Sequence, residues 1–259
     1  MTGKSYEHRA VYLHLMPERF MLLPNRLLRA ALTMAMALLA GACASVDVGG
    51  APGPSVSAPQ YRVGDTWVYH IVDGYRAKIV WDETHEVTAI GADGVTVKVI
   101  AKGPTIDVER IEKWPSPGVV LQGSVYEDET NRFDPPLVRY KFPLSTGETW
   151  NQRVIDLEKP PAPYGGISRS TTVGGYEKIT TPAGTFDAIR MRLFMQMDDE
   201  TFWRYPTQCN YLIWYAPAVG VSVREQKESQ WRDKGGQDAS GYHPGQNATI
   251  ELVSYTRGR

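Results

Sequence analysis

Apolar and polar side chains alternate in short runs from residue 60 onward, and glycine or proline follows nearly every run. Over 185–195, for example, four apolar side chains share one face of an extended chain and two arginines share the other. A period of two is typical of a half-buried β-strand, whereas an amphipathic helix needs apolar residues at spacings of three and four. The 24 glycines and 18 prolines also break helices and favour turns. We therefore expect many short strands.

These strands predict an all-β fold, in which an antiparallel, strongly curved sheet forms a half-open barrel or a sandwich. No linker-like stretch divides residues 60–259, so a single β domain is expected. Tight turns are expected at Asp73-Gly74, 91–94 and 181–184. The expected strands are 63–72, 75–90, 95–101, 119–126, 138–142, 173–181, 185–195, 211–215, 219–225 and 248–255.

A short sequence repeat occurs at the start of two expected strands. Gly64-Asp65-Thr66-Trp67 recurs as Gly147-Glu148-Thr149-Trp150, and each copy precedes a polar strand with a Glu-to-Thr spacing and a turn that contains glycine. One interpretation is an internal duplication, with halves near 60–143 and 144–259. The other is that Gly-polar-Thr-Trp is simply a favourable way to start a strand. The sequence leaves both open.

Residues 1–42 have the features of an export signal. Arg26 and Arg29 are followed by 13 uncharged, mostly apolar residues. A membrane-spanning helix needs about 20 such residues, so this run is too short to cross a bilayer. It fits the apolar region of a signal peptide, and translation from Met16 or Met21 gives a signal of ordinary length. A buried core helix is the alternative, but it does not explain the small residues at the end of the run.

The end of this segment, Leu38-Leu39-Ala40-Gly41-Ala42-Cys43, resembles a bacterial lipobox. The resemblance implies that Cys43 is diacylated, for example with palmitate, and becomes the mature N-terminus. The usual leucine of the motif is Ala40 here, and ordinary signal-peptidase cleavage near Ala42 is the alternative. Because Ala44 rather than Asp follows the cysteine, analogy with enterobacterial lipoproteins implies the outer membrane, with the protein facing the periplasm.

Residues 43–59 are expected to be the lipidated N-terminus followed by a flexible tether, because glycine, proline and small residues dominate them. If Cys43 carries lipid, the chain has no internal disulfide, and Cys209 is expected to be buried and inert. A reactive or dimer-forming Cys209 is the alternative. Residues 43–259 hold 23 of the 28 basic and 27 of the 29 acidic groups, a net charge of −4. That balance gives no attraction to nucleic acid.

Three motifs in 142–221 resemble a bacterial envelope family of unknown function, the TapB-like lipoproteins. They are the Phe-Pro-Leu to Trp segment 142–150, the Pro-Ala-Gly-Thr-Phe turn within 177–188, and the Trp-Tyr-Ala-Pro segment 214–221. The resemblance extends over roughly 60–225. It implies an architecture like that of the half-open barrels that carry lipoproteins and other amphiphiles through the periplasm. The motifs consist of turns and strand starts, so they imply a fold and no mechanism.

No residues with catalytic or metal-binding spacing stand out, so no cofactor or metal is expected. With Asp73-Gly74 as a two-residue turn, His70 faces Ala77 and lies roughly 26 Å from His85, and His243 falls in a loop. Acidic clusters occur at 82–86, 127–129 and 198–200. They are expected in solvated loops, with calcium binding at 198–200 or a glycosidase pair as alternatives.

The mature chain is rich in tryptophan, with all seven residues after position 42. Tryptophan and tyrosine on a concave sheet could bind an apolar chain or a sugar, but they could equally fill the core of a β domain. Trp114 and Trp231 have proline-rich or polar neighbours. These two are therefore expected to be the most exposed, and are candidate binding residues.

These observations favour a non-catalytic outer-membrane lipoprotein, anchored through Cys43, whose curved sheet binds an amphiphile or another envelope protein. The first alternative is a periplasmic hydrolase that uses acidic side chains on the open face of the sheet. The second is a purely structural envelope component. An inner face that is open and apolar, open and acidic, or filled would distinguish the three.

Overall fold

The computed structural model describes residues 49–126, 129–159, 165–235 and 241–259. The predicted signal segment 1–42 and Cys43 lie outside these residues. Regular structure in the described part of the chain is entirely β, which confirms the predicted all-β class. None of these residues forms a helix of the length and hydrophobicity needed to cross a bilayer.

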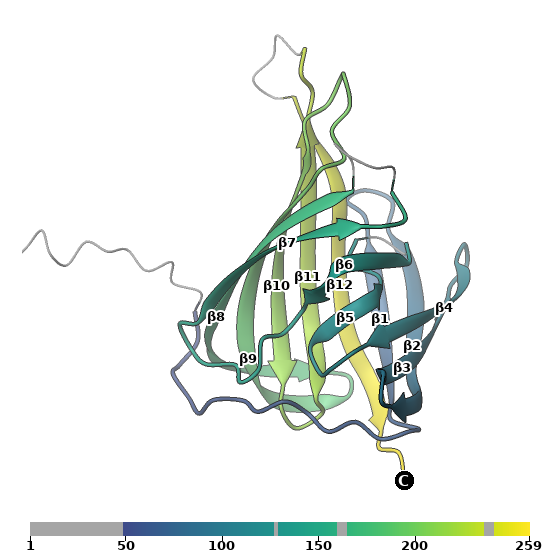
Figure 1. Cartoon of the computed structure of the whole chain (residues 1–259), viewed down its shortest axis with the longest axis vertical. Coiled ribbons are helices and arrows are strands. Elements are labelled where there is room, and N and C mark those ends of the chain that lie inside the picture. Colours follow the sequence, from purple (N-terminus) through teal and green to yellow (C-terminus); the bar gives the residue numbers. More distant parts are fainter. Residues whose placement is uncertain (1–48, 127–128, 160–164, 236–240) are drawn as a thin grey trace, which may run out of the picture. The chain divides into compact units, whose positions relative to one another are not determined.

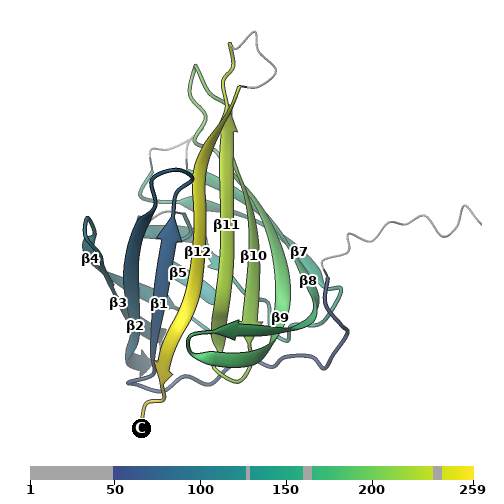
Figure 2. The same cartoon turned by 180° about the vertical axis from the view of Figure 1, so that it is seen from behind.

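Twelve antiparallel strands close into a barrel in which neighbours in space are neighbours in sequence, and β12 returns to pair with β1 (Figures 1 and 2). The predicted curved sheet is thus a closed ring. The strands are β1 Thr66–Asp73, β2 Ile79–Gly91, β3 Gly94–Lys102, β4 Asp107–Trp114, β5 Val119–Gly123, β6 Asn131–Val138, β7 Thr149–Asp156, β8 Gly166–Thr181, β9 Gly184–Met197, β10 Thr207–Ala216, β11 Val221–Arg232 and β12 Tyr242–Thr256.

The core fills part of the barrel interior, and the alternation of the sequence determines which side chains enter it. On β3, Val95, Val97, Val99 and Ala101 are buried, while the residues between them are less so. Each of the three valines contributes on the order of 1.5–3 kcal/mol through removal from water. Other strands keep this period over part of their length, but β10 is buried at consecutive positions from 213 to 216 and β11 from 221 to 223.

The main-chain hydrogen bonding between neighbouring strands of the barrel is weakest from β4 to β7. β8 and β9 pair from Ile167↔Met197 to Thr181↔Gly184, whereas β4 and β5 align only through Lys113↔Gln122. β6 contains Pro135 and Pro136, and proline has no N–H to donate to a ladder. These strands therefore have few main-chain hydrogen bonds to one another.

A side-chain amide partly replaces the missing ladder between β6 and β7. Gln152 Nε2 donates to the carbonyl of Pro136 at 2.8 Å, and Gln152 Oε1 accepts from the N–H of Val138 at the same distance. One glutamine thus supplies a donor and an acceptor to β6, as a backbone residue of a neighbouring strand would. The Gln122 amide similarly donates to the carbonyl of Ile111, between β5 and β4.

The prediction of a free tether is wrong for the described part of 43–59. Val56 N and Leu144 O lie 2.9 Å apart, as do Leu144 N and Val56 O. The Val56 side chain is buried in a cluster that includes Leu144, Tyr140 and Tyr215. The sequence of this segment suggests a tether because it lacks periodicity. In the structure it is also held by backbone hydrogen bonds between Ala51 and Tyr176, at 3.0 and 2.7 Å.

The two copies of the repeat make the same turn. Gly64 and Gly147 have φ values of 88° and 86°, which glycine adopts without strain. Gly64 N donates to Val87 O at 2.8 Å, and Gly147 N donates to Val173 O at 2.9 Å. The likeness extends to the return hydrogen bonds, Val87 N to Asp65 O at 2.9 Å and Val173 N to Glu148 O at 2.8 Å. The Glu-to-Thr segments are not equivalent, because Thr66 pairs with Glu86 whereas Thr149 pairs with Thr172 and not with the Glu177 segment. Both interpretations of the repeat stay open.

Several strand predictions were wrong. β4, β6 and β7 were missed, and the expected strand 138–142 shares only Val138 with β6. The turn after β1 spans 74–78, so His70 faces Asp82 and not Ala77. β4 was missed because its inner face carries Arg110 and Glu112, and Val108, at the start of that same face, is exposed. Charged residues at inward positions hide the alternation by which a strand is recognised.

Candidate functional site in the barrel lumen

The barrel encloses a cavity of about 400 Å³, within the range of small-molecule sites. Its lining comes from strands on all sides of the ring, and aromatic and aliphatic side chains dominate it. The aromatic residues are Tyr61, Trp67, Tyr69, Trp81, Trp114, Tyr140 and Tyr211. The main aliphatic residues are Ile71, Leu193, Met195, Ile213, Val221 and Ile250. The inner face is therefore open and largely apolar.

One side of the cavity carries a buried charge network formed by β2 and β4, which we call the charged wall: Glu83, His85, Arg110 and Glu112. Arg110 donates to Glu83 through two nitrogens, at 2.9 and 3.3 Å, and its Nε lies 3.4 Å from Glu112. His85 Nε2 lies 2.8 Å from Glu83. The side chains of Arg110 and Glu83 are only 6% and 11% exposed. Each carboxylate of the wall thus has a cationic partner.

Two tryptophans orient the carboxylates of the charged wall. Trp114 Nε1 donates to Glu112 at 2.9 Å, and Trp81 Nε1 donates to Glu83 at 3.3 Å. Trp114 is 6% exposed, so the prediction that it is an exposed residue is wrong. The indole is amphipathic, and here its N–H serves a buried carboxylate while its rings line the lumen.

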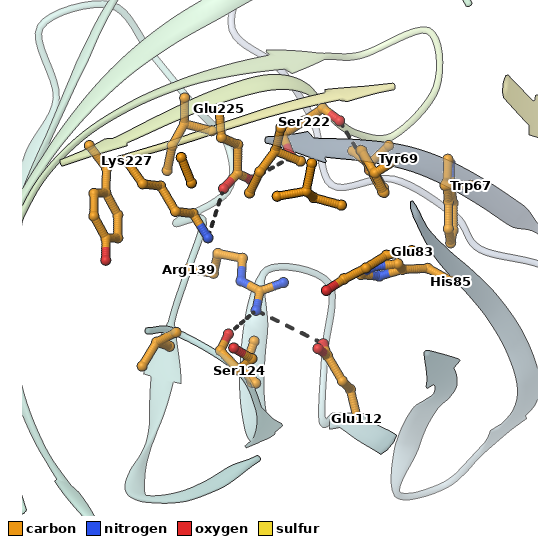
Figure 3. Close-up of a pocket in the computed structure, with 18 of the residues that line it drawn as sticks. Trp67, Tyr69, Glu83, His85, Glu112, Ser124, Arg139, Ser222, Glu225 and Lys227 are labelled. Atoms are coloured by element: carbon orange, nitrogen blue, oxygen red, sulfur yellow. Dashed lines mark hydrogen bonds and ion pairs between the residues drawn. The ribbon is translucent and has the colours of Figure 1, made fainter. Parts of the chain in front are cut away.

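Arg139 follows β6 and extends into the lumen between the charged wall and β11 (Figure 3). Its guanidinium donates to the carbonyl of Ser124 at 3.2 Å and lies 3.9 Å from Glu112. On the opposite side, Lys227 and Glu225 of β11 form an ion pair at 3.3 Å. Charged groups therefore face the cavity from two sides.

The lumen carboxylates are held in the ionised form. Burial would raise the pKa of Glu83, but the hydrogen bonds and charges of His85 and Arg110 outweigh it and hold that pKa below its usual value. Burial likewise opposes ionisation of Glu112, whose pKa is nevertheless lowered by Arg139 and Arg110. For Glu225, Lys227 and the Ser222 hydroxyl overcome burial and lower the pKa.

Arg169 enters the cavity from β8 and has a different environment from the other cations. Its side chain is on the inward face, because Ile167, Arg169 and Thr171 are buried and the residues between them are less so. The residue is 7% exposed, and its buried Nε has no hydrogen-bond partner. No residue in the described ranges forms an ion pair or hydrogen bond with it. Burial lowers its pKa to about 10, so it remains charged at neutral pH.

The three described histidines lie in separate places. His70 contacts Asp82 at 2.7 Å on the outer surface, His85 belongs to the charged wall, and His243 contacts Asp233 at 2.8 Å. Within the residues that the structure describes, no group of three His, Cys, Asp or Glu side chains could hold a metal ion. Cys209 is buried on β10, as predicted.

The acidic clusters do not form one site. Glu83 belongs to the charged wall, while its neighbour Asp82 faces outward. Glu129 pairs with Lys159 at 2.6 Å, and Glu127 and Asp128 lie outside the described residues. The cluster 198–200 makes three separate ion pairs, to Arg153, Arg204 and Lys234. The expectation of a solvated loop is therefore wrong for 82–86, which lies within β2. Asp198, Asp199 and Glu200 follow β9 outside any strand, and all three are paired.

Trp231 lies away from the cavity, near the end of β11. It stacks on His243 with ring centroids 4.1 Å apart and meets Trp203 edge to face at 5.2 Å. It is half-buried, while the neighbouring Phe202 is 91% exposed. The structure therefore separates the two tryptophans that the sequence suggested as binding residues, and only Trp114 lines the lumen.

Comparison with known proteins adds three distant structural likenesses. A candidate lipoprotein from Parabacteroides distasonis is 17% identical, with a TM-score of 0.44 over 79% of this chain and 100% of its own. A candidate exported protein with a YmcC-like fold from Bacteroides fragilis is 11% identical, with a TM-score of 0.42 over the same shares. The hypothetical lipoprotein YmcC from Escherichia coli is 11% identical, with a TM-score of 0.34 over 86% of this chain and 94% of its own.

No protein-family model matches the chain. No curated protein matches it either. The resemblance to the TapB-like lipoproteins therefore stays a prediction.

Proposed function

We propose that the protein is a lipid-anchored lipoprotein of the bacterial envelope whose barrel lumen binds an amphiphilic small molecule. Attachment through Cys43 would place it on the outer membrane, facing the periplasm. The observation that supports binding is the cavity of about 400 Å³, with aromatic and aliphatic lining on most sides and charged groups on the rest. A site with both kinds of surface suits a ligand with an apolar body and a polar end.

The lumen favours this proposal over the two alternatives. A structural component would have a filled interior, and a cavity of this size leaves room for a ligand. A glycosidase needs one protonated carboxyl group beside an ionised one. Glu83 and Glu112 are close together on Arg110, but both have lowered pKa values and neither would serve as the acid. A protein partner would meet the barrel wall, whereas a small amphiphile can occupy the lumen.

The neutral fluorescent probe N-phenyl-1-naphthylamine tests the site. Leu193 on β9 lines the cavity, and its neighbour Phe194 faces outward with 47% exposure. Leu193→Trp should fill the lumen and reduce probe binding about tenfold or more, whereas Phe194→Trp should leave binding unchanged. Thermal unfolding would show that both variants fold. Wild-type protein that does not bind the probe, or equal binding by both variants, would refute the proposal.

The anchor is tested separately in a bacterial host that processes lipoproteins. Cys43→Ala should release the protein from the membrane fraction or leave an unprocessed precursor of lower mobility. Mass spectrometry of the wild-type N-terminal peptide should show an acylated cysteine. A Cys43→Ala protein that is processed and membrane-associated like the wild type would contradict lipidation.

A further inference from the structure

Resting on the proposed function, we propose that Arg169 binds the anionic head group of a single-chain amphiphile, either a carboxylate or a phosphate. The first observation is that Arg169 lines the cavity and is more than nine-tenths buried. A guanidinium in such a position has five N–H donors arranged to hold a carboxylate or phosphate in bidentate fashion. Its Nε is buried and lacks an acceptor within the described part of the chain.

The other three lumen cations have carboxylate partners, which sets Arg169 apart. Arg110 is bound to Glu83, Arg139 lies 3.9 Å from Glu112, and Lys227 lies 3.3 Å from Glu225. A fourth acidic residue in the lining, Asp73, accepts a hydrogen bond from the N–H of Asn247 at the end of β1. The charge of Glu225 favours the Arg169 cation, but it does so without a direct ion pair or hydrogen bond. A buried charge without a direct partner is unfavourable, so proteins rarely keep one unless something else compensates it. An anion in the lumen would be that compensation.

The surroundings of Arg169 are suited to the rest of such a ligand. Arg169 pairs in register with Met195 on β9, and Met195, Leu193 and Ile213 line the same cavity. An apolar chain that extends from a head group at Arg169 would therefore contact this aliphatic surface. A cavity of about 400 Å³ suits one acyl chain better than the two or three of a diacylated or triacylated lipid.

A pair of probes separates this inference from the proposed function. Dansylamino-undecanoic acid carries a carboxylate, and its methyl ester is the matched neutral probe. We expect wild-type protein to bind the acid about 10- to 100-fold more tightly than the ester, as a charge-assisted bidentate contact implies. Dodecanoate and dodecyl phosphate should displace the acid, whereas acetate and inorganic phosphate should not. Displacement by the short anions would instead indicate a site for free anions.

Arg169→Met should abolish the preference for the acid and leave ester binding unchanged. Arg153→Met is the matched control, because Arg153 is 57% exposed on the neighbouring strand β7, where it pairs with Asp198. Unchanged ester binding by Arg169→Met shows that this variant is folded. Arg169→Lys keeps the charge and should retain part of the preference for the acid.

The outcomes distinguish the proposed ligand site in the lumen from the proposed role of Arg169. If the wild type binds the acid and the ester equally, or if Arg169→Met keeps the preference, the lumen is a ligand site but Arg169 does not hold a head group. If neither probe binds the wild type, the proposed function fails and this inference fails with it.

Discussion

Removing Arg110 should destabilise the protein by about 3–5 kcal/mol, the usual effect of taking one partner from a buried ion pair. Arg110 donates to Glu83 at 2.9 and 3.3 Å and to Glu112 at 3.4 Å. Glu83 would keep His85, and Glu112 would keep the Trp114 N–H at 2.9 Å. Because of these remaining contacts, the expected loss in the free energy of unfolding is near the lower end of that range, at about 3 kcal/mol. The groups are too buried for solvent to screen the loss.

Urea unfolding of Arg110→Met at neutral pH, followed by tryptophan fluorescence, measures this effect. Arg153→Met is the control, because it removes an exposed arginine from a surface ion pair and should cost less than about 1 kcal/mol. Adding Glu83→Leu to Arg110→Met removes the carboxylate that has lost its arginine partner. The double variant should therefore be more stable than the sum of the single changes predicts, by about 1–3 kcal/mol.

Two results would refute this reasoning. One is an Arg110→Met variant no less stable than Arg153→Met, which would mean that Arg110 does not compensate a buried charge. The other is strict additivity of Arg110→Met and Glu83→Leu, which would mean that the two side chains are not coupled.

Three further predictions concern pH, glycine and the Gln152 amide. Because the folded-state pKa values of Glu83, Glu112 and Glu225 are lowered, the stability that these groups contribute is complete above the usual value of 4.5 and is lost as the pH falls through the folded pKa values. Urea midpoints should therefore decrease below about pH 4.5, less steeply in Glu83→Gln, and a midpoint that is constant to pH 3 would contradict this. Gly147→Ala should reduce the free energy of unfolding by about 1–2 kcal/mol because of the positive φ alone. Gly94→Ala should reduce it more, because its Cβ would lie 2.1 Å from the Trp114 carbonyl oxygen. Thermal unfolding measures both, and equal losses would contradict this prediction. Gln152→Ala should reduce the free energy of unfolding by about 1–2 kcal/mol more than the control Asn151→Ala, which changes an exposed neighbouring residue, because Gln152 makes both hydrogen bonds to β6. Indistinguishable urea unfolding curves would show that these two hydrogen bonds contribute nothing.

A strand with an apolar buried face, such as β9, was found from the sequence, whereas β4, whose inner face carries Arg110 and Glu112, was missed. The segment 185–195 lies within β9, and the 181–184 turn joins β8 to β9 as expected. β8 was expected from residue 173 but begins at Gly166, because the segment 166–172 is mostly polar. Arg169 lies in that omitted part. The same property, a polar inner face, thus hid both a strand boundary and a residue of the candidate site.

The candidate site was harder to predict because its members are distant in sequence. Glu83, Glu112 and Glu225 come from three strands, and only barrel closure places them around one cavity. Trp114 was expected outside because of its proline-rich neighbours, but its indole N–H has a carboxylate acceptor inside the barrel. Sequence patterns report which face of a strand a residue occupies, but not which strands face one another across a lumen.

The order of strands around the ring has a consequence for how the protein folds. Among the ladders of the described residues, all join consecutive strands except the one between β1 and β12. A hairpin forms as soon as its two strands are available, whereas joining β1 to β12 closes a loop of nearly the whole domain and carries the largest entropy loss. If the chain crosses a membrane from its N-terminus, the open sheet would expose both edges until β12 arrives. We therefore expect closure by β12 to be the slow step of folding, and a chaperone would be most useful just before it.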